Sequence, residues 1–120
     1  MKKLFNSARY AVQGLFHFIR TDRNGQIELV CAITAITFGF LLHISHIEWC
    51  LIIICICVVL AAEMFNHSIE KTNDFISREH HKEIGQIKDV AASAVMMTVF
   101  MSIAICYLVL FSKIISRFIQ

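Results

Sequence analysis

Residues 90–112 read VAASAVMMTVFMSIAICYLVLFS, a stretch of 23 residues without a formal charge. At about 1.5 Å per residue, a helix of that length spans the ~30 Å hydrocarbon core of a bilayer. Residues 29–47 form another uncharged stretch, 19 residues long, which is sufficient for the same purpose. The two stretches predict two transmembrane helices.

A third apolar stretch, residues 49–62, is short for a membrane span and is followed by Glu63. It becomes a full span if the helix continues to Glu70 and carries polar groups into the membrane edge. Polar residues at that depth usually face a partner, a cavity or a functional site. We therefore expect an all-α membrane domain over residues 1–120, with transmembrane helices at about 27–47, 49–70 and 90–113.

The composition supports a membrane environment. Hydrophobic residues make up 58% of the chain and the mean hydropathy is +0.68, whereas a soluble domain is about half apolar. A small soluble fold could not bury that excess, because its surface is large relative to its volume. The net charge of +2 gives no indication of a nucleic-acid partner. The five cysteines form no C-x-x-C pair and are expected to be buried, reduced thiols.

The N-terminal segment has a different character. Charges are scattered through it and it lacks the compact apolar core of a signal peptide. Residues 4–20 combine apolar and basic side chains in a pattern typical of an amphipathic helix at a membrane interface. A helix packed against the transmembrane bundle is an equally open interpretation. Its apolar side chains are Phe5, Tyr10, Val12, Leu15, Phe16 and Ile19.

The distribution of Lys and Arg predicts the orientation in the membrane. Five of these residues precede the first span and four lie between residues 71 and 88, whereas two lie after residue 112. Basic residues are enriched in cytoplasmic loops. We therefore expect a cytoplasmic N-terminus and second connection, and a C-terminus outside. Eight of the nine acidic residues then lie near the cytoplasmic interface, and only Glu48 lies at the other one.

Glu63, Asn66 and Glu70 are spaced i, i+3 and i+7, so one helix face presents two carboxylates and an amide. Glu63 lies deeper in the membrane and suits proton transfer. Glu70 lies nearer to water and suits an oxygen-preferring cation such as Mg²⁺. These residues predict metal-assisted chemistry or ion coupling at the cytoplasmic interface.

Three other interpretations of these carboxylates remain open. Glu63 or Glu70 could form a structural ion pair with Lys88. Glu63 could cycle a proton in a small cation-coupled transporter. The acids could also pair with Lys88 and Arg78 in a helical assembly factor without catalytic activity. The four glycines exclude both G-x-G-x-x-G and the Walker A loop, so any phosphates would have to be held by Mg²⁺ and basic side chains.

The motif EMFNHSIE at residues 63–70 resembles the pattern E-x-x-N-[ST]-[AS]-I-E of the prokaryotic diacylglycerol kinase family. Asp74, His81 and KDVAASAV at 88–95 follow at the family's spacing. The resemblance covers nearly the whole chain. Further matches are Tyr10, Gly14–Leu15, the DRN of 22–24 and Glu48–Trp49.

The resemblance implies a homotrimeric enzyme of the bacterial inner membrane that transfers the γ-phosphate of ATP to a lipid hydroxyl. It implies Glu63 as the general base, Asn66 as a support for that region, and Asp22 and Glu70 as ligands of Mg²⁺. The implied ATP-binding residues are Tyr10, Asp22, Glu70, Glu79, His80, His81, Lys88 and Asp89. The implied supporting or lipid-binding residues are Asn66, Asn24, Glu28 and Trp49.

Four residues depart from the family pattern. Asp22 stands where Glu is usual, His67 stands where Ser or Thr is usual, and Gly25 and Gln26 stand where an aromatic and a basic residue are common. The family splits between diacylglycerol and undecaprenol as acceptor. Residues 22–24 and 48–49 favour undecaprenol, whereas Glu28 and Gly85 favour diacylglycerol. Diacylglycerol is the acceptor that we expect from the sequence.

Overall fold

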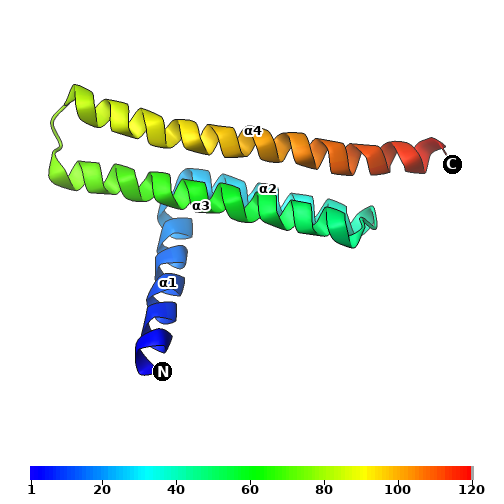
Figure 1. Cartoon of the computed structure of the whole chain (residues 1–120), viewed down its shortest axis with the longest axis horizontal. Coiled ribbons are helices and arrows are strands. Elements are labelled where there is room, and N and C mark those ends of the chain that lie inside the picture. Colours follow the sequence, from blue (N-terminus) through cyan, green and yellow to red (C-terminus); the bar gives the residue numbers. More distant parts are fainter. Residues whose placement is uncertain (120) are drawn as a thin grey trace.

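The computed structural model describes residues 1–119, and all the regular structure in that range is helical. Helix α1 (Lys2–Thr21) leads into α2 (Arg23–Leu41), α3 (His46–Ile76) and α4 (Lys82–Ile119). Figure 1 shows α2, α3 and α4 running side by side, with α1 projecting from the start of α2. The prediction of an all-α chain with three long apolar helices is confirmed, because α2, α3 and α4 are each long and apolar enough to cross a membrane.

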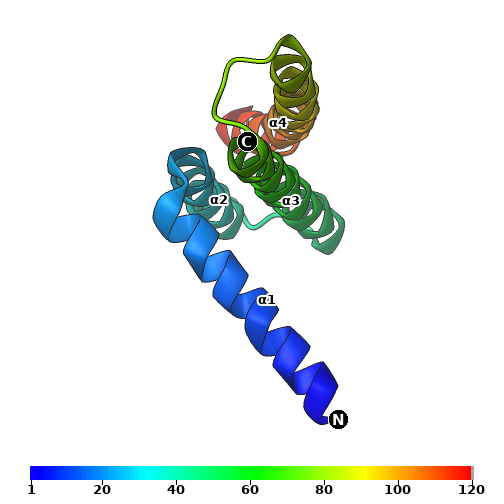
Figure 2. The same ribbon diagram turned by 90° about the vertical axis from the view of Figure 1, so that its left-hand side faces the viewer.

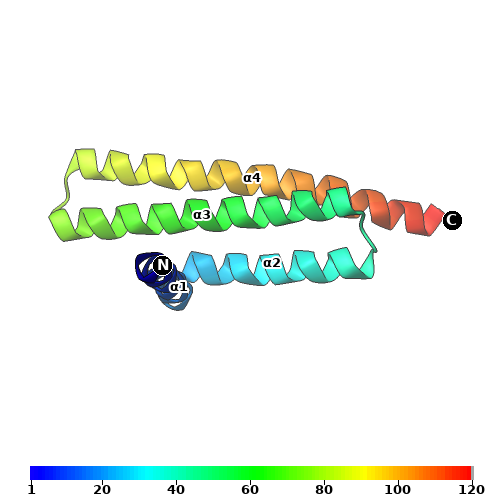
Figure 3. The ribbon, with the colours of Figure 1, turned by 60° about the horizontal axis from the view of Figure 1, so that its bottom comes forward.

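Helix α3 lies between the other two long helices. It packs along α4 and against α2, whereas α2 and α4 contact each other little. Figure 3 shows the same arrangement from another side, with α3 between α2 and α4. The main apolar cluster surrounds Ile44, Ile52 and Val109, and Ile52 has no exposed surface. Most other large apolar side chains of α2, α3 and α4 are exposed on the single chain, as expected for helices that face lipid.

The turn between α2 and α3 comprises residues 42–45. Helix α2 ends at Leu41, and His43 then adopts a left-handed conformation with φ of 50°. Ser45 and Glu48 form a capping box that starts α3 at His46, because each side chain accepts a hydrogen bond from the other residue's backbone N–H. Glu48 therefore lies in the first turn of α3.

Both α3 and α4 extend beyond the apolar stretches at the end where they are joined. Helix α3 continues through polar residues to Ile76 and α4 begins at Lys82, which leaves only residues 77–81 as a connection. The polar segment 71–89 is thus mostly helical. Figures 1 and 2 show that this connection lies at the end of the bundle and that α1 extends away from it.

The prediction for the cysteines is wrong for three of the five. All five are free thiols, but in the isolated chain only Cys55 is buried and Cys106 is half-buried. The other three are exposed on helices that are apolar enough to face lipid: Cys31, Cys50 and Cys57. A helix in a membrane gains nothing by turning a small apolar side chain away from lipid, so burial does not follow from apolar sequence here.

Candidate active site

The corner between α1 and α2 positions Asp22. This residue leaves the helical conformation (φ −101°, ψ 120°) and acts as the N-cap of α2. Its Oδ2 accepts a hydrogen bond of 2.7 Å from the backbone N–H of Gly25. A carboxylate is favoured at this position because the first N–H groups of a helix lack partners within it. The capping fixes the Asp22 side chain at the start of α2.

One face of α3 carries the residues that the sequence singled out. Glu63 is 5% exposed and Asn66 is 8% exposed, while Glu70 is half-buried. Asn73 continues the same face, is 7% exposed, and donates a hydrogen bond of 3.0 Å to the carbonyl of Ile69. Sequence reasoning missed Asn73, although its spacing of three residues from Glu70 continues the i, i+3, i+7 pattern.

The acidic side chains of α2 and α3 form a cluster. Glu28 lies close enough to Glu63 and Asp22 for their charges to repel, and Glu63 is close enough to interact with Asp22 and Glu70. Glu28 Oε2 and Asn66 Oδ1 are buried, and neither has a hydrogen-bond partner within residues 1–119. Buried oxygens of this kind are costly unless something else satisfies them. We call Asp22, Glu28, Glu63 and Glu70 the acidic cluster.

His67 also belongs to this region, although no functional role is predicted for it from the sequence. Its Nδ1 lies 3.0 Å from Oδ1 of Asp22, and both side chains are largely buried, at 13% and 17% exposed. The contact joins α3 to the corner between α1 and α2. The departure of residue 67 from the family pattern was the available signal, but the partner, 45 positions earlier, could not be found without the fold.

Lys88 pairs with a different residue from those considered in the sequence. Its Nζ lies 2.6 Å from Oδ1 of Asp74. The interpretation that pairs Lys88 with Glu63 or Glu70 is therefore wrong for the single chain. Asp74 lies 11 positions after Glu63 on the continuous helix α3, which places it about 16 Å further along the axis. Lys88 thus lies beyond Glu70, toward the connection of α3 and α4.

Other residues expected around the site are dispersed in one chain. Tyr10 is exposed on α1, which extends away from the bundle (Figure 2). Trp49 packs against Phe40 at the other end of α3, with ring centroids 4.7 Å apart. The remaining members are exposed and lie at the start of α2, in the connection of α3 and α4, or on α4: Asn24, Glu79, His80, His81 and Asp89.

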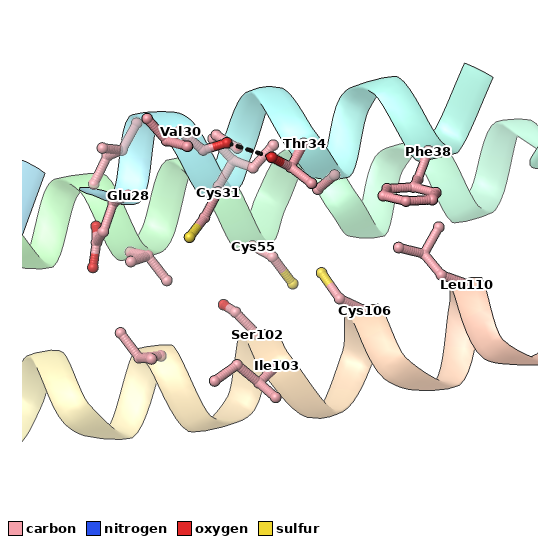
Figure 4. Close-up of a pocket in the computed structure, with 16 residues that line it drawn as sticks. Glu28, Val30, Cys31, Thr34, Phe38, Cys55, Ser102, Ile103, Cys106 and Leu110 are labelled. Carbon is pink, nitrogen blue, oxygen red and sulfur yellow. Dashed lines mark hydrogen bonds between the residues drawn. The ribbon is translucent and has the colours of Figure 1, made fainter. Parts of the chain in front are cut away.

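An apolar groove runs from the acidic cluster toward the opposite end of the bundle. It has a volume of about 410 Å³ and is lined by residues of α2, α3 and α4. Figure 4 shows Glu28 at one end, Phe38 and Leu110 at the other, and Cys55, Ser102 and Cys106 between them. On α3 the lining includes Val59 and Leu60, one helical turn before Glu63.

The donors in the acidic cluster suit Mg²⁺ in kind. Mg²⁺ prefers oxygen ligands and is commonly bound through one or two carboxylates together with substrate phosphates. Asp22, Glu70 and the unpaired Glu28 Oε2 supply carboxylate oxygens. Within residues 1–119 no three His, Cys, Asp or Glu side chains converge tightly enough to form a complete metal site.

Comparison with known proteins identifies the family. A family model described as prokaryotic diacylglycerol kinase matches residues 9–110. The undecaprenol kinase of Bacillus subtilis is 33% identical over 95% of this chain and 93% of its own length. The diacylglycerol kinase of Haemophilus influenzae is 31% identical over 78% of this chain and 80% of its own. The diacylglycerol kinase of Escherichia coli K12 is 24% identical over 92% of this chain and 90% of its own length.

The family match spans most of the chain and includes the α3 face, the acidic cluster and the Lys88–Asp89 pair. The three apolar helices agree with a multi-pass membrane protein. The chain therefore belongs to the prokaryotic diacylglycerol kinase family and is a lipid kinase.

Proposed function

We propose that this protein transfers the γ-phosphate of ATP to the hydroxyl of a membrane lipid alcohol, with Mg²⁺ as cofactor. The observation that supports this most is the position of Glu63. It is buried among other carboxylates on α3, one helical turn from the end of an apolar groove. A lipid whose chain lay in that groove would present its hydroxyl near Glu63.

The chain's residues divide the reaction between them. Glu63 accepts the proton of the lipid hydroxyl as its oxygen bonds to the γ-phosphorus and the bond from that phosphorus to the bridging oxygen of ADP breaks. Asp22 and Glu70 hold the metal, and Lys88 meets the phosphates. Mg²⁺ supplies charge neutralisation on the phosphate oxygens. Asn66 lies one helical turn after Glu63 on the same buried face of α3, where it supports the position of the base.

We further propose that the sites are completed between subunits of a homotrimer. Within one chain the pair of Asp74 and Lys88 lies about 16 Å further along the axis of α3 than Glu63. Helix α1, which carries Tyr10, extends away from the connection that carries Glu79, His80 and His81 (Figure 1). A neighbouring chain would supply the missing groups. Helix α1 then lies on the membrane surface, with the N-terminus and the sites on the cytoplasmic side, where ATP is found, and the C-terminus outside.

The acceptor that we propose is undecaprenol, with diacylglycerol as the second candidate. The similarity to an undecaprenol kinase extends over nearly the whole of both chains, and residues 22–24 and 48–49 point the same way. Diacylglycerol, the acceptor expected from the sequence, is supported by the names of other relatives. Purified protein in detergent with Mg-ATP should phosphorylate undecaprenol more efficiently than diacylglycerol, measured as kcat/KM. The reverse order would assign diacylglycerol, and no product with either lipid would favour the transporter or assembly interpretation.

Filling the groove should impair use of the lipid and leave use of ATP unchanged. Cys106 lines the groove, so Cys106→Phe should raise the apparent KM for the lipid about tenfold with little change in the KM for Mg-ATP. Ala104→Phe is the matched control, because Ala104 is exposed on the same helix and does not line the groove. Equal effects of both variants would argue against the groove as the lipid site.

Glu48 should be dispensable for turnover. It accepts a hydrogen bond of 2.6 Å from the N–H of Ser45 and pairs with Lys113 at 3.2 Å, at the end of the bundle opposite the acidic cluster. Gln can keep the capping hydrogen bond, so Glu48→Gln should change kcat by less than about twofold, since a partly exposed ion pair contributes little. A folded Glu48→Gln protein without lipid kinase activity would show that the proposed site is wrongly placed.

A further inference from the structure

The corner between α1, α2 and α3 contains a set of contacts that the reaction scheme does not use. His67 of α3 reaches Asp22, the N-cap of α2, through Nδ1 at 3.0 Å. Because an ionised carboxylate only accepts hydrogen bonds, the pair requires a proton on Nδ1. The other oxygen of Asp22 is held by the N–H of Gly25 at 2.7 Å. Each oxygen of the Asp22 carboxylate thus has a hydrogen-bond partner that fixes its direction.

Phe18 holds the His67 ring in place. Phe18 is 4% exposed and meets His67 edge-on, with ring centroids 5.5 Å apart and an interplanar angle of 75°. Its ring also lies directly over Gly25, where an added Cβ would approach the Phe18 ring to 2.6 Å. Only glycine at position 25 leaves room for the aromatic ring in this position. The imidazole is therefore restrained by packing as well as by its hydrogen bond.

Gln26 ties the two sides of the corner together. Its Nε2 lies 3.1 Å from the carbonyl of Ile19 and 3.3 Å from that of Arg20, so a side chain of α2 satisfies carbonyls in the last turn of α1. Asp22, Gly25, Gln26 and His67 are the four positions at which the sequence departs from the family pattern. The structure places all four in this one corner.

We infer that His67 is a positioning residue, which orients the Asp22 carboxylate for the metal and thereby sets the affinity for Mg-ATP. The inference rests on the proposed function. Partners that hold a ligating side chain in place typically change metal affinity by about 10- to 100-fold when removed. Asp22 is one methylene shorter than glutamate, so its carboxylate extends less far from the backbone. The contact with His67 holds that carboxylate in one orientation.

The test compares three variants at position 67 and a control. His67→Ala should weaken the Mg²⁺-dependent binding of a non-hydrolysable ATP analogue about tenfold, and raise the KM for Mg-ATP with a smaller change in kcat. His67→Asn should recover most of the affinity, because the Asn amide nitrogen can donate from the position of Nδ1, whereas His67→Leu should not. Thr72→Ala is the control, since Thr72 is exposed on the same helix and its hydroxyl donates a hydrogen bond to the carbonyl of Ser68.

Several outcomes would overturn the inference. Unchanged binding in His67→Ala, with the unmodified protein still phosphorylating lipid, would remove the positioning role and leave the proposed function intact. If the loss in His67→Ala persisted undiminished in an Asp22→Ala background, the effect would come from the packing against Phe18 and not from Asp22. If His67→Ala failed to fold, the comparison of His67→Asn with His67→Leu would decide. A folded His67→Asn protein that bound the ATP analogue no better than His67→Leu would contradict the inference. Absence of lipid phosphorylation by the unmodified protein would instead reject the proposed function.

Discussion

Glu63→Gln is expected to lower kcat for lipid phosphorylation about 1000-fold while leaving the binding of Mg-ATP nearly unchanged. General-base catalysis typically contributes 10²- to 10⁴-fold, so the expected loss corresponds to about 4 kcal/mol of transition-state stabilisation. Gln preserves the shape of the side chain but cannot take the proton. Because Glu63 is 5% exposed and surrounded by other acids, its replacement by a neutral amide should not destabilise the fold.

The measurements are initial rates with saturating lipid, together with equilibrium binding of a non-hydrolysable ATP analogue in the presence of Mg²⁺. Glu48→Gln is the matched control, since it makes the same chemical change on the same helix, about 22 Å away along α3. A Glu63→Gln protein that retained more than about a tenth of the rate would exclude Glu63 as the base. Loss of nucleotide binding in that variant would instead assign Glu63 to the metal site.

The α3 face could be predicted because it depends on local geometry. A continuous helix places Glu63, Asn66 and Glu70 on one side whatever surrounds it, and the structure has them on an uninterrupted helix from His46 to Ile76. The three apolar helices could be predicted for a similar reason, since the bilayer sets the length of an uncharged stretch. Both arguments need only the sequence within one element.

Contacts between elements could not be predicted in the same way. Asp22 and His67 are 45 positions apart, and their pairing depends on how α2 packs against α3. Several acidic residues were possible partners of Lys88. Lys88 pairs with Asp74 because α3 continues to Ile76 and α4 begins as early as Lys82. The position of Phe18 over Gly25 likewise depends on the angle of the corner. Each of these features required the relative placement of two helices.

Glu70→Ala is the second substitution with a large expected effect. Glu70 is half-buried on the α3 face, about two helical turns nearer than Glu63 to the connection of α3 and α4. Its charge interacts with that of Glu63. Removing a carboxylate that holds the metal should raise the apparent KM for Mg-ATP about 100-fold, since loss of a mere supporting contact already costs 10- to 100-fold. The rate at saturating Mg-ATP should recover in large part, because Glu63 remains in place.

The experiment varies Mg²⁺ at fixed ATP and follows phosphorylated lipid. Glu83→Ala is the control. Glu83 is exposed in the first turn of α4, so this substitution removes an equal charge outside the acidic cluster. If Glu70 merely contributed negative charge, both variants would shift the Mg²⁺ dependence alike, and raised salt would abolish the difference from the unmodified protein. Direct participation in metal binding requires that the shift be confined to Glu70→Ala and persist at high salt. An unaltered Mg²⁺ dependence in Glu70→Ala would remove this residue from the metal site and leave Asp22 and Glu28 as its carboxylates.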